Sequence, residues 1–316
     1  MKVAYICPYF GTLPKFIQLW LNSFSTNKEA TVFLLTDDKQ SLRYPDNFVV
    51  KYMTIDDFRN DIQAKFDFPI SLTGIYKIGD YKPTLGYVYE DMIKGFDAWA
   101  YLDVSDEIMG DLSDFVNEEL INKYDKLMAR GHMSIYKNSY ENNRRFMDDS
   151  GEAFNYKDIL LSDKFYNFEE IAPGSIAKIY SKNGYPMSLM SDAVADLSGI
   201  YYGFRRDSIK DDLTYFCEDK DVSIYSRENG KIFGYFVRGD HLVKKEYLYV
   251  HFKRRKMELN VPLDAQNFLI TPKGFEPYQE VDLDLVKKLG KGKLFYYMYF
   301  KEIKNSIKRR LHLSKR

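Results

Sequence analysis

The 316-residue chain carries 46 basic and 46 acidic side chains, so its formal net charge is zero. A content of 45% hydrophobic and 29% charged residues excludes a largely disordered chain, and the zero net charge argues against a general nucleic-acid binder. The two cysteines, Cys7 and Cys217, are too few for a disulfide framework or a cysteine zinc site.

Strand and helix patterns alternate over the first hundred residues. Short apolar runs predict strands at residues 3–7, 31–35, 48–52 and 98–102. Apolar residues at helical spacing predict helices at residues 16–24, 55–66 and 82–96, the last with Pro83 in its first turn. This alternation predicts an α/β fold, a Rossmann-type, mostly parallel sheet with helices on both faces.

The middle of the chain is less regular. Residues 138–157 are polar and read as a loop-rich excursion, and further strands are predicted at residues 200–204, 232–237 and 247–252. No flexible linker interrupts the sequence, so we expect one domain over residues 1–280, followed by a basic tail over residues 281–316.

The tail holds most of the charge asymmetry. Residues 287–316 contain eleven Lys and Arg against one acid, Glu302, so this segment carries +10 and the preceding residues sum to −10. Tyr296, Phe300, Ile303 and Ile307 recur at helical spacing. The pattern predicts a basic amphipathic helix, which either binds an anionic membrane surface or packs on the domain as a solvated terminal helix. With no signal peptide and no apolar run long enough to cross a bilayer, we expect a cytoplasmic protein.

Polar and acidic residues follow three of the predicted strands. In parallel sheets ligands sit at the carboxyl ends of the strands, here residues 8–11, 36–38 and 103–106. Asp103 and Asp106 offer hard oxygen ligands that suit Mg²⁺ or Mn²⁺, with a substrate diphosphate completing the shell. The alternative is an acidic turn whose aspartate caps the next helix.

A second motif joins a histidine to cations. His251 ends an apolar run and is followed by four consecutive basic residues at 253–256. The imidazole could complete a metal shell and the cations could hold a diphosphate; alternatively, a core-edge histidine precedes a solvated basic turn. Asp80 and Lys82 begin a predicted helix, where they either meet an anion or form an ordinary cap.

Several common catalytic signatures are missing from the sequence. It has no glycine-rich dinucleotide fingerprint, no phosphate-loop motif, no nucleophile elbow and no His-Glu-x-x-His. The sequence therefore lacks the motifs that usually indicate hydride transfer, NTP hydrolysis, serine hydrolysis or zinc proteolysis.

Several segments of the sequence, in the same order along the chain, together resemble a known protein family. The resemblance rests on residues 8–11, 19–23, 36–38, 79–83 with 86–87, 99–112, 131–132 and 251–257. Together they resemble a family of bacterial glycosyltransferase-like proteins found in capsule and exopolysaccharide gene clusters. The likeness covers most of residues 1–260 and leaves out the basic tail. It implies a GT-A fold with a nucleotide-binding half at about residues 1–112 and an acceptor half at about 113–280.

The resemblance also implies roles for single residues. The nucleoside of a nucleotide sugar would lie against Tyr9, Phe10, Gly11, Thr36, Asp37 and Asp38. Asp80 and Lys82 would touch the donor sugar and phosphate, and Lys253, Arg254 and Arg255 would neutralise the leaving diphosphate. Asp103 and Asp106 would form the Asp-x-Asp motif, with His251 as the third metal ligand; Lys82 would act with the two aspartates in catalysis.

One departure from the family pattern lies in the acidic motif. The spacing from Asp103 to Gly110 contains one extra residue, which gives Asp-x-x-Asp. A bulge could absorb it and keep Asp103 and Asp106 on the metal. Alternatively Asp106 and Glu107 take over, or the metal site is weakened.

The resulting hypothesis is a transferase. A Mn²⁺- or Mg²⁺-dependent enzyme would move a hexose from a nucleotide diphosphate sugar, first of all a UDP-sugar, to a polysaccharide repeat or lipid-linked glycan. The basic tail would hold it at the inner face of the cell membrane. Retention is favoured slightly over inversion, for which Glu169, Glu170, Asp192 or Asp196 would have to serve as base. The alternatives are a catalytically degenerate nucleotide-sugar or glycan-binding protein of a membrane-associated assembly and a metal-dependent phosphotransferase.

Overall fold

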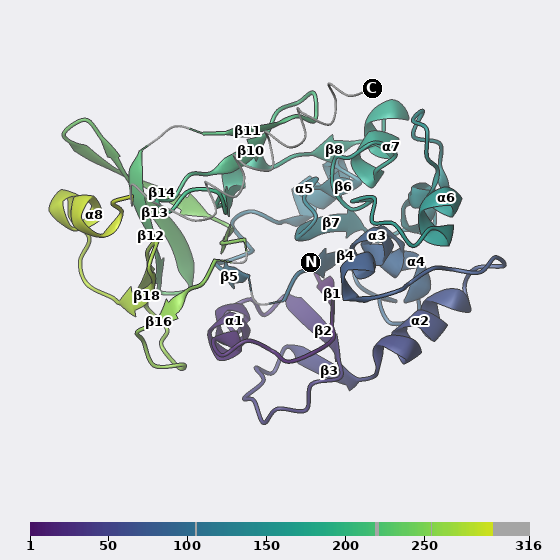
Figure 1. The fold of residues 1–316 in the computed structure, drawn as a ribbon, viewed down its shortest axis with the longest axis horizontal. Coiled ribbons are helices and arrows are strands. Elements are labelled where there is room, and N and C mark those ends of the chain that lie inside the picture. Colours follow the sequence, from purple (N-terminus) through teal and green to yellow (C-terminus); the bar gives the residue numbers. More distant parts are fainter. Residues whose placement is uncertain (105, 219–220, 254, 293–316) are drawn as a thin grey trace, which may run out of the picture. The chain divides into compact units, whose positions relative to one another are not determined.

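The computed structural model describes residues 1–104, 106–218, 221–253 and 255–292 (Figure 1). The chain divides into two compact units. Unit 1 comprises residues 1–105, 112–191 and 209–214, and unit 2 comprises residues 106–111, 192–208 and 215–316. The predicted nucleotide-binding and acceptor halves stay predictions. The predicted amphipathic helix of the tail lies outside the described residues from residue 293 onward.

Unit 1 is built on a seven-stranded sheet with the strand order β3-β2-β1-β4-β7-β6-β8. Four neighbouring strands are parallel, and β1 lies between β2 and β4, with Val3 opposite both Ala30 and Ala98. The α/β class with a mostly parallel sheet is therefore confirmed. The strands are β1 Val3–Tyr9, β2 Ala30–Thr36, β3 Phe48–Tyr52, β4 Ala98–Leu102, β6 Lys126–Leu127, β7 Met133–Lys137 and β8 Met187–Ser188.

Helices cover both faces of this sheet. Alternate residues of a strand point to opposite faces: Ala4 and Ile6 of β1 join the large core beneath the other helices, whereas Tyr5 packs on Phe24 of α1, with ring centres 5.6 Å apart. The helices are α1 Ile17–Phe24, α2 Ile55–Gln63, α3 Ile78–Tyr81, α4 Leu85–Val88, α5 Glu118–Lys123, α6 Tyr156–Leu161 and α7 Ile176–Lys182, with 3-10 turns at Ile75–Lys77, Lys82–Thr84, Asn142–Met147 and Ser191–Ala193.

The helix predicted at residues 82–96 is wrong in both bounds. The helical run begins at Ile75 and ends at Val88, and Pro83 lies in its middle within a 3-10 turn. Proline has no N–H for an i→i−4 bond, so the run breaks into short α and 3-10 pieces around it. Lys82 is therefore inside the run and buried, not at an exposed helix start.

Unit 2 contains an antiparallel sheet and a small three-stranded sheet. The six-stranded sheet has the order β14-β13-β12-β17-β18-β16, and α8 (Leu283–Leu289) packs on one of its faces. The small sheet has the order β5-β15-β9. The strands are β5 Glu107–Met109, β9 Val194–Asp196, β11 Tyr215–Cys217, β12 Val222–Glu228, β13 Lys231–Arg238, β14 His241–Tyr247, β15 Tyr249–His251, β16 Glu258–Leu259, β17 Phe268–Ile270 and β18 Gly274–Pro277; β10 (Asp207–Ile209) lies at the division between the units.

The strand predicted at residues 200–204 is a loop. The buried guanidinium of Arg255 donates hydrogen bonds to the carbonyl oxygens of Ser198, Tyr201 and Tyr202, which draws these carbonyls toward one point instead of into a ladder. Within the part of the chain that the structure describes, no helix is both long enough and apolar enough to cross a membrane.

Candidate functional site

The parallel sheet of unit 1 has a topological switch point. From β1 the chain passes to β2 and β3 on one side, and it returns to β4 on the other. In open α/β sheets ligands bind at such a point, outside the carboxyl ends of the two strands that flank it. The carboxyl ends of β1 and β4 lead into residues 10–13 and Asp103, so these segments form the candidate site of unit 1 (Figure 1).

Two residues predicted to bind the nucleoside connect the loop after β1 to the loop after β2 by hydrogen bonds. Asp37 accepts a hydrogen bond from the Gly11 N–H at 2.7 Å, and Asp38 accepts one from the Leu13 N–H, also at 2.7 Å. The Leu13 N–H holds the pKa of Asp38 below its usual value. Gly11 has φ +107°, which favours glycine, so the loop conformation depends on this residue.

The other predicted nucleoside contacts lie in the same loops. Tyr9 donates its hydroxyl hydrogen bond to the Thr12 carbonyl at 3.0 Å, and Thr36 accepts one from the Asp38 N–H at 3.1 Å. Phe10 is buried against Phe58. The structure therefore gathers these residues in unit 1, and their contact with a nucleoside stays a prediction.

Lys82 and Asp103 form an ion pair at the end of β4. The Lys82 ammonium also donates to the carbonyl oxygen of Gly131 at 2.7 Å, and its side chain is 9% exposed against 43% for that of Asp103. A buried cation beside a half-exposed carboxylate places a fixed positive charge at the switch point, where a phosphate could meet it.

Asp80 is fully buried and has its own partners in unit 1. Its carboxylate pairs with the Lys77 ammonium at 2.8 Å and accepts hydrogen bonds from the N–H groups of Tyr166 and Phe168. These bonds connect the helical run to the segment before α7. This arrangement favours a structural role, and contact of Asp80 with the donor sugar stays a prediction.

Glu169 lies buried in the same unit. Burial raises the pKa of its carboxyl to about 8, while the positive charge of Lys82 opposes that rise. One carboxyl oxygen lies so close to Gly79 that a Cβ there would approach it to 2.4 Å. Glu169 is thus a carboxyl group held partly protonated near neutral pH, the state that general acid–base chemistry uses.

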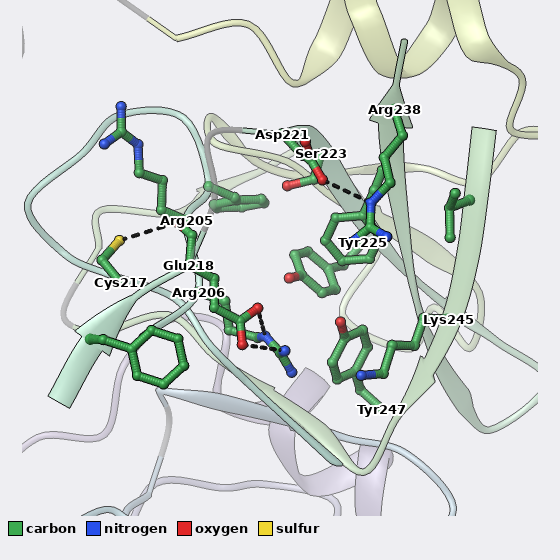
Figure 2. A pocket seen from close by; sticks show the side chains of 14 residues that line it. Arg205, Arg206, Cys217, Glu218, Asp221, Ser223, Tyr225, Arg238, Lys245 and Tyr247 are labelled. Atoms are coloured by element: carbon green, nitrogen blue, oxygen red, sulfur yellow. Dashed lines mark hydrogen bonds and ion pairs between the residues drawn. The ribbon is translucent and has the colours of Figure 1, made fainter. Parts of the chain in front are cut away.

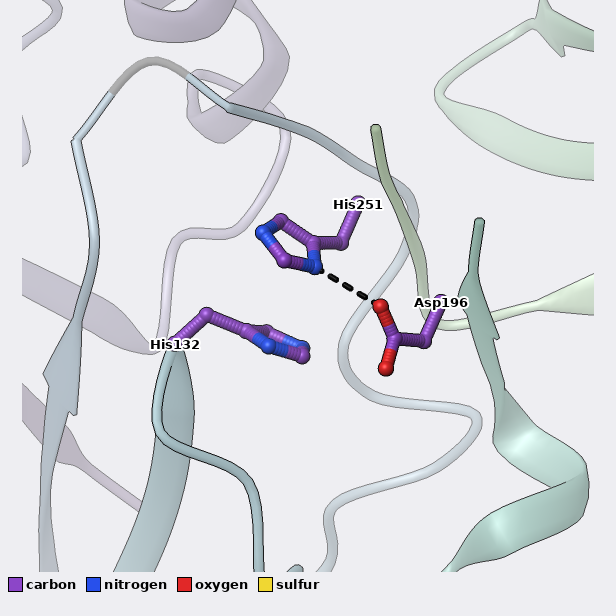
Figure 3. A group of neighbouring side chains, drawn as sticks. All are labelled: His132, Asp196 and His251. Carbon is purple, nitrogen blue, oxygen red and sulfur yellow. Dashed lines mark hydrogen bonds and ion pairs between the residues drawn. The ribbon is translucent and has the colours of Figure 1, made fainter. Parts of the chain in front are cut away.

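In unit 2, His251 sits between two acids on the small three-stranded sheet. It is directly opposite Glu107 of β5 and Asp196 of β9. Its Nδ1 lies 2.8 Å from Asp196 Oδ1 (Figure 3). Its Nε2 lies 3.9 Å from Glu107 Oε1. All three side chains are buried. Imidazole and carboxylate oxygens are ligands that suit Mn²⁺ and related divalent ions.

Three buried side chains, His132, Asp196 and His251, each offer an atom that could hold a metal ion, and Figure 3 draws them. His132 belongs to unit 1, and Asp196 and His251 belong to unit 2. From the sequence alone, Asp196 is a candidate base, and residue 132 belongs only to a segment of the family resemblance. Pairing of strands more than fifty residues apart, β9 with β15, brings Asp196 to His251, and no local pattern signals it.

The two aspartates of the acidic motif belong to different units, Asp103 to unit 1 and Asp106 to unit 2. The backbone carbonyl of Asp106 accepts a hydrogen bond from the Phe252 N–H at 2.9 Å, which extends the pairing beside His251. As metal ligands, Asp103, Asp106 and His251 together stay a prediction.

The predicted diphosphate cations differ in their surroundings. Lys253 pairs with Asp207 at 2.6 Å and with Asp196 at 3.3 Å. Burial lowers the pKa of Lys253, but the two aspartates outweigh it and raise the pKa overall. Arg255 is occupied by the carbonyl groups described above, and Arg254 lies outside the described residues.

Comparison with known proteins gives a family and a distant structural likeness. The chain resembles the crystal structure of the glycosyltransferase GlyE of Streptococcus pneumoniae TIGR4 with TM-score 0.33 and 14% identity over 61% of this chain and 46% of that chain. The values for its apo form are TM-score 0.32 and 14% identity over 59% and 44%. The aligned part thus spans less than half of those chains. No curated protein matches the sequence.

The family comparison covers most of the chain. The sequence profile of a family of unknown function, DUF6625, matches residues 5–279, which include every described site residue discussed above. This protein therefore belongs to the DUF6625 family.

Proposed function

We propose that this protein is a metal-dependent glycosyltransferase with a GT-A-like fold that transfers a hexose from a nucleotide diphosphate sugar, in the first place a UDP-sugar. The observation that carries the proposal is the switch point between β1 and β4, with the Lys82–Asp103 ion pair at its edge. Two of the segments that resemble capsule-cluster glycosyltransferases, residues 8–11 and 99–112, include the carboxyl ends of β1 and β4. The acceptor would be a growing polysaccharide repeat or a lipid-linked glycan.

In this proposal, different residues of the chain bind different parts of the donor. The loops joined by Asp37 and Asp38 would receive the nucleoside, and Lys82 would contact the donor's phosphate or sugar while it orients Asp103. Lys253 would face the diphosphate with a positive charge that its two aspartates maintain. Each contact would strengthen as negative charge develops on the leaving group.

The metal ligands are a second part of the proposal. Asp196 and His251 offer a carboxylate oxygen and an imidazole nitrogen within unit 2, with Glu107 as a further oxygen donor. Asp106, a ligand predicted from the sequence, belongs to the same unit and would add a second aspartate carboxylate. A bound Mn²⁺ or Mg²⁺ would act as a Lewis acid toward the leaving diphosphate.

Calorimetric titration of UDP with Mn²⁺ and then with EDTA tests the proposal. We expect binding that needs Mn²⁺ and that weakens at least about tenfold in His251→Ala, a loss of ~1.4 kcal/mol. The matched control is His241→Ala, whose side chain is 83% exposed at the start of β14. Metal-independent UDP binding would identify a nucleotide-sugar binding protein instead, and absence of UDP binding in both conditions would overturn the proposal.

A further inference from the structure

A cavity of about 440 Å³ lies within unit 2, on one face of the six-stranded sheet (Figure 2). Strands β12, β13 and β14 form its floor through alternate residues: Ser223, Tyr225, Phe236, Val243, Lys245 and Tyr247. The intervening residues, such as Ile224 and Tyr235, face the other way and pack on Val286 of α8. One face of the sheet is therefore core, and the opposite face lines the cavity.

Two tyrosine hydroxyl groups point into this cavity. Tyr225 is 1% exposed and Tyr247 is 2% exposed, and their ring centres lie 5.7 Å apart. Among the described residues neither hydroxyl has a hydrogen-bond partner, and Figure 2 shows both directed into the space between the lining side chains. Both hydroxyl groups therefore face the cavity, where each can donate a hydrogen bond to a polar ligand and accept one from it.

The charges around the cavity favour an anion. Its lining includes the cations Arg205, Arg206, Arg238 and Lys245 and the acids Glu218 and Asp221. Arg206 holds Glu218 in a bidentate pair at 2.8 and 2.5 Å, and Arg238 lies 3.1 Å from Asp221. Both acids are thus already neutralised by two of the four cations.

Of the other two cations, Lys245 is the one whose charge lies beside the floor of the cavity. The Lys245 ammonium lies 3.3 Å from Asp192, whose side chain is 91% exposed, so water screens this pair. The Arg205 guanidinium stacks on the Tyr201 ring at 3.7 Å, and Figure 2 shows it directed away from the two tyrosine hydroxyl groups. The Lys245 ammonium also lies 5.2 Å from the centre of the Tyr247 ring, so its charge stands beside this ring.

We propose that this cavity binds an anionic sugar residue, one that carries a carboxylate or a phosphate group. The aromatic rings of the floor suit the apolar face of a sugar, and the hydroxyl groups of Tyr225 and Tyr247 suit its own hydroxyl groups. Lys245 would hold the anion. The volume falls in the range of small-ligand pockets. The suggestion that the cavity holds an acidic acceptor glycan rests on the proposed transferase function. The suggestion that the cavity binds an anionic sugar does not.

Cys217 gives a direct readout of occupancy. Cys217 is one of the residues that line the cavity and is exposed, whereas the other cysteine, Cys7, is fully buried. The alkylation rate of the full-length native protein with iodoacetamide therefore reports on Cys217 alone. It is measured with D-glucuronate, D-glucose 6-phosphate, neutral D-glucose and citrate, in EDTA and without nucleotide. We expect one or both anionic sugars to slow alkylation, with glucose and citrate weaker by at least about fivefold.

Variants at the floor test which side chains bind. Tyr225→Phe, Tyr247→Phe and Lys245→Gln should each weaken protection by about fivefold, because each loses one hydrogen bond or charge contact. Lys244→Gln is the matched control: it removes the same charge one residue earlier on β14, where the ammonium pairs with Glu228 on the opposite face. The tyrosine variants keep the ring, so the floor should stay packed.

The outcomes separate this inference from the proposed function. Protection by glucuronate alone assigns the anion as a carboxylate, and protection by glucose 6-phosphate alone assigns it as a phosphate. Absence of protection by both, equal protection by citrate, or protection unchanged in all three floor variants would overturn the inference, even if Mn²⁺-dependent UDP binding is found. In a separate assay UDP is added in EDTA in place of the sugars. Protection by UDP would also overturn the inference, because the cavity would then be a nucleotide site.

Discussion

The Lys77–Asp80 pair of unit 1 is an almost fully buried ion pair. Its side chains are 3% and 0% exposed, and the carboxylate also accepts two backbone hydrogen bonds. Asp80→Asn would leave the Lys77 charge buried without its partner, so we expect a loss of about 3–5 kcal/mol in the free energy of unfolding. Urea denaturation followed by circular dichroism measures it.

A matched control lies on α2. Asp56 and Arg59 have the same i,i+3 spacing, but their side chains are 71% and 35% exposed. Solvent-exposed pairs contribute little because water screens them, so Asp56→Asn should leave the urea midpoint almost unchanged. Equal destabilisation by the two variants would show that burial of Asp80 does not matter. If Asp80→Asn folds normally but loses UDP binding, the donor contact predicted from the sequence gains support.

Glu169 makes stability depend on pH in an unusual direction for a carboxyl group. Burial raises its pKa from 4.5 to about 8 in the folded protein. The stability that protonation provides is complete below the unfolded value near 4.5 and is lost as pH rises through the folded value near 8. Between these values the contribution falls by up to ~1.4 kcal/mol per pH unit.

Glu169→Gln should therefore remove this fall, because the amide keeps the shape of the neutral carboxyl and does not titrate. The free energy of unfolding is measured from pH 5 to 8 for the wild type, Glu169→Gln and the adjacent Glu170→Gln, whose side chain is only half-buried. We expect the smallest slope in Glu169→Gln alone. Parallel curves for all three proteins would contradict a raised pKa at Glu169.

The sequence predicted where polar side chains lie in the fold better than it predicted their hydrogen-bond partners. Asp37 and Asp38 do follow β2, as expected, yet their carboxylates bind the N–H groups of Gly11 and Leu13. Those bonds join segments that are about 25 residues apart in sequence, and they form only because β1 and β2 are parallel neighbours. A sequence shows which side chains lie at the end of a strand. The N–H group that such a carboxylate binds, however, depends on which strand is the neighbour in the sheet.

At the scale of elements, the floor of the cavity depends on a glycine, which leaves room for two neighbouring rings. Gly234 of β13 stands opposite Tyr225 and Lys245, and a Cβ there would approach ring carbons of Phe236 and Tyr247 to 2.8 Å. Gly234→Ala would push both rings out of place, so we expect a loss of about 1–3 kcal/mol in unfolding free energy and altered Cys217 alkylation.

Gly74→Ala is the control for this prediction. It lies outside any strand or helix of three residues or more, and no atom lies within 4 Å of the added Cβ. Its backbone φ of 175° is extended and open to alanine. Thermal unfolding of the two variants should separate them clearly. A Gly234→Ala protein as stable as wild type would mean that the rings shift without strain.

The elements themselves were predictable where a local pattern decides them. Strands β3 and β4 have the predicted bounds because each is a short run of strand-forming residues between breakers. Pro83 misled the prediction, because proline is common at a helix start but here lies inside a 3-10 turn. The small sheet around His251 was not predictable, because β5, β15 and β9 come from distant segments and are only three residues long.

At the scale of the whole molecule, the charge is unevenly distributed along the chain. Residues 287–316 carry +10 and the remainder carries −10. A cluster of this density attracts anionic lipid headgroups with about 1 kcal/mol per basic residue near the surface. The full chain should therefore sediment with vesicles that contain phosphatidylserine and not with phosphatidylcholine vesicles, and about 0.5 M salt should release it because the attraction is screened.

The position of the charge, and not its amount, is what this prediction tests. Replacement of Lys301, Lys304 and Lys308 by glutamine should weaken vesicle binding by tenfold or more, since three headgroup contacts are lost. The control replaces three exposed lysines of unit 1, at positions 28, 39 and 94, and changes the net charge by the same amount. If both triple variants bind equally, net charge explains the attraction. If neither the wild type nor the control binds, the tail has another role and an acceptor embedded in a membrane loses its support.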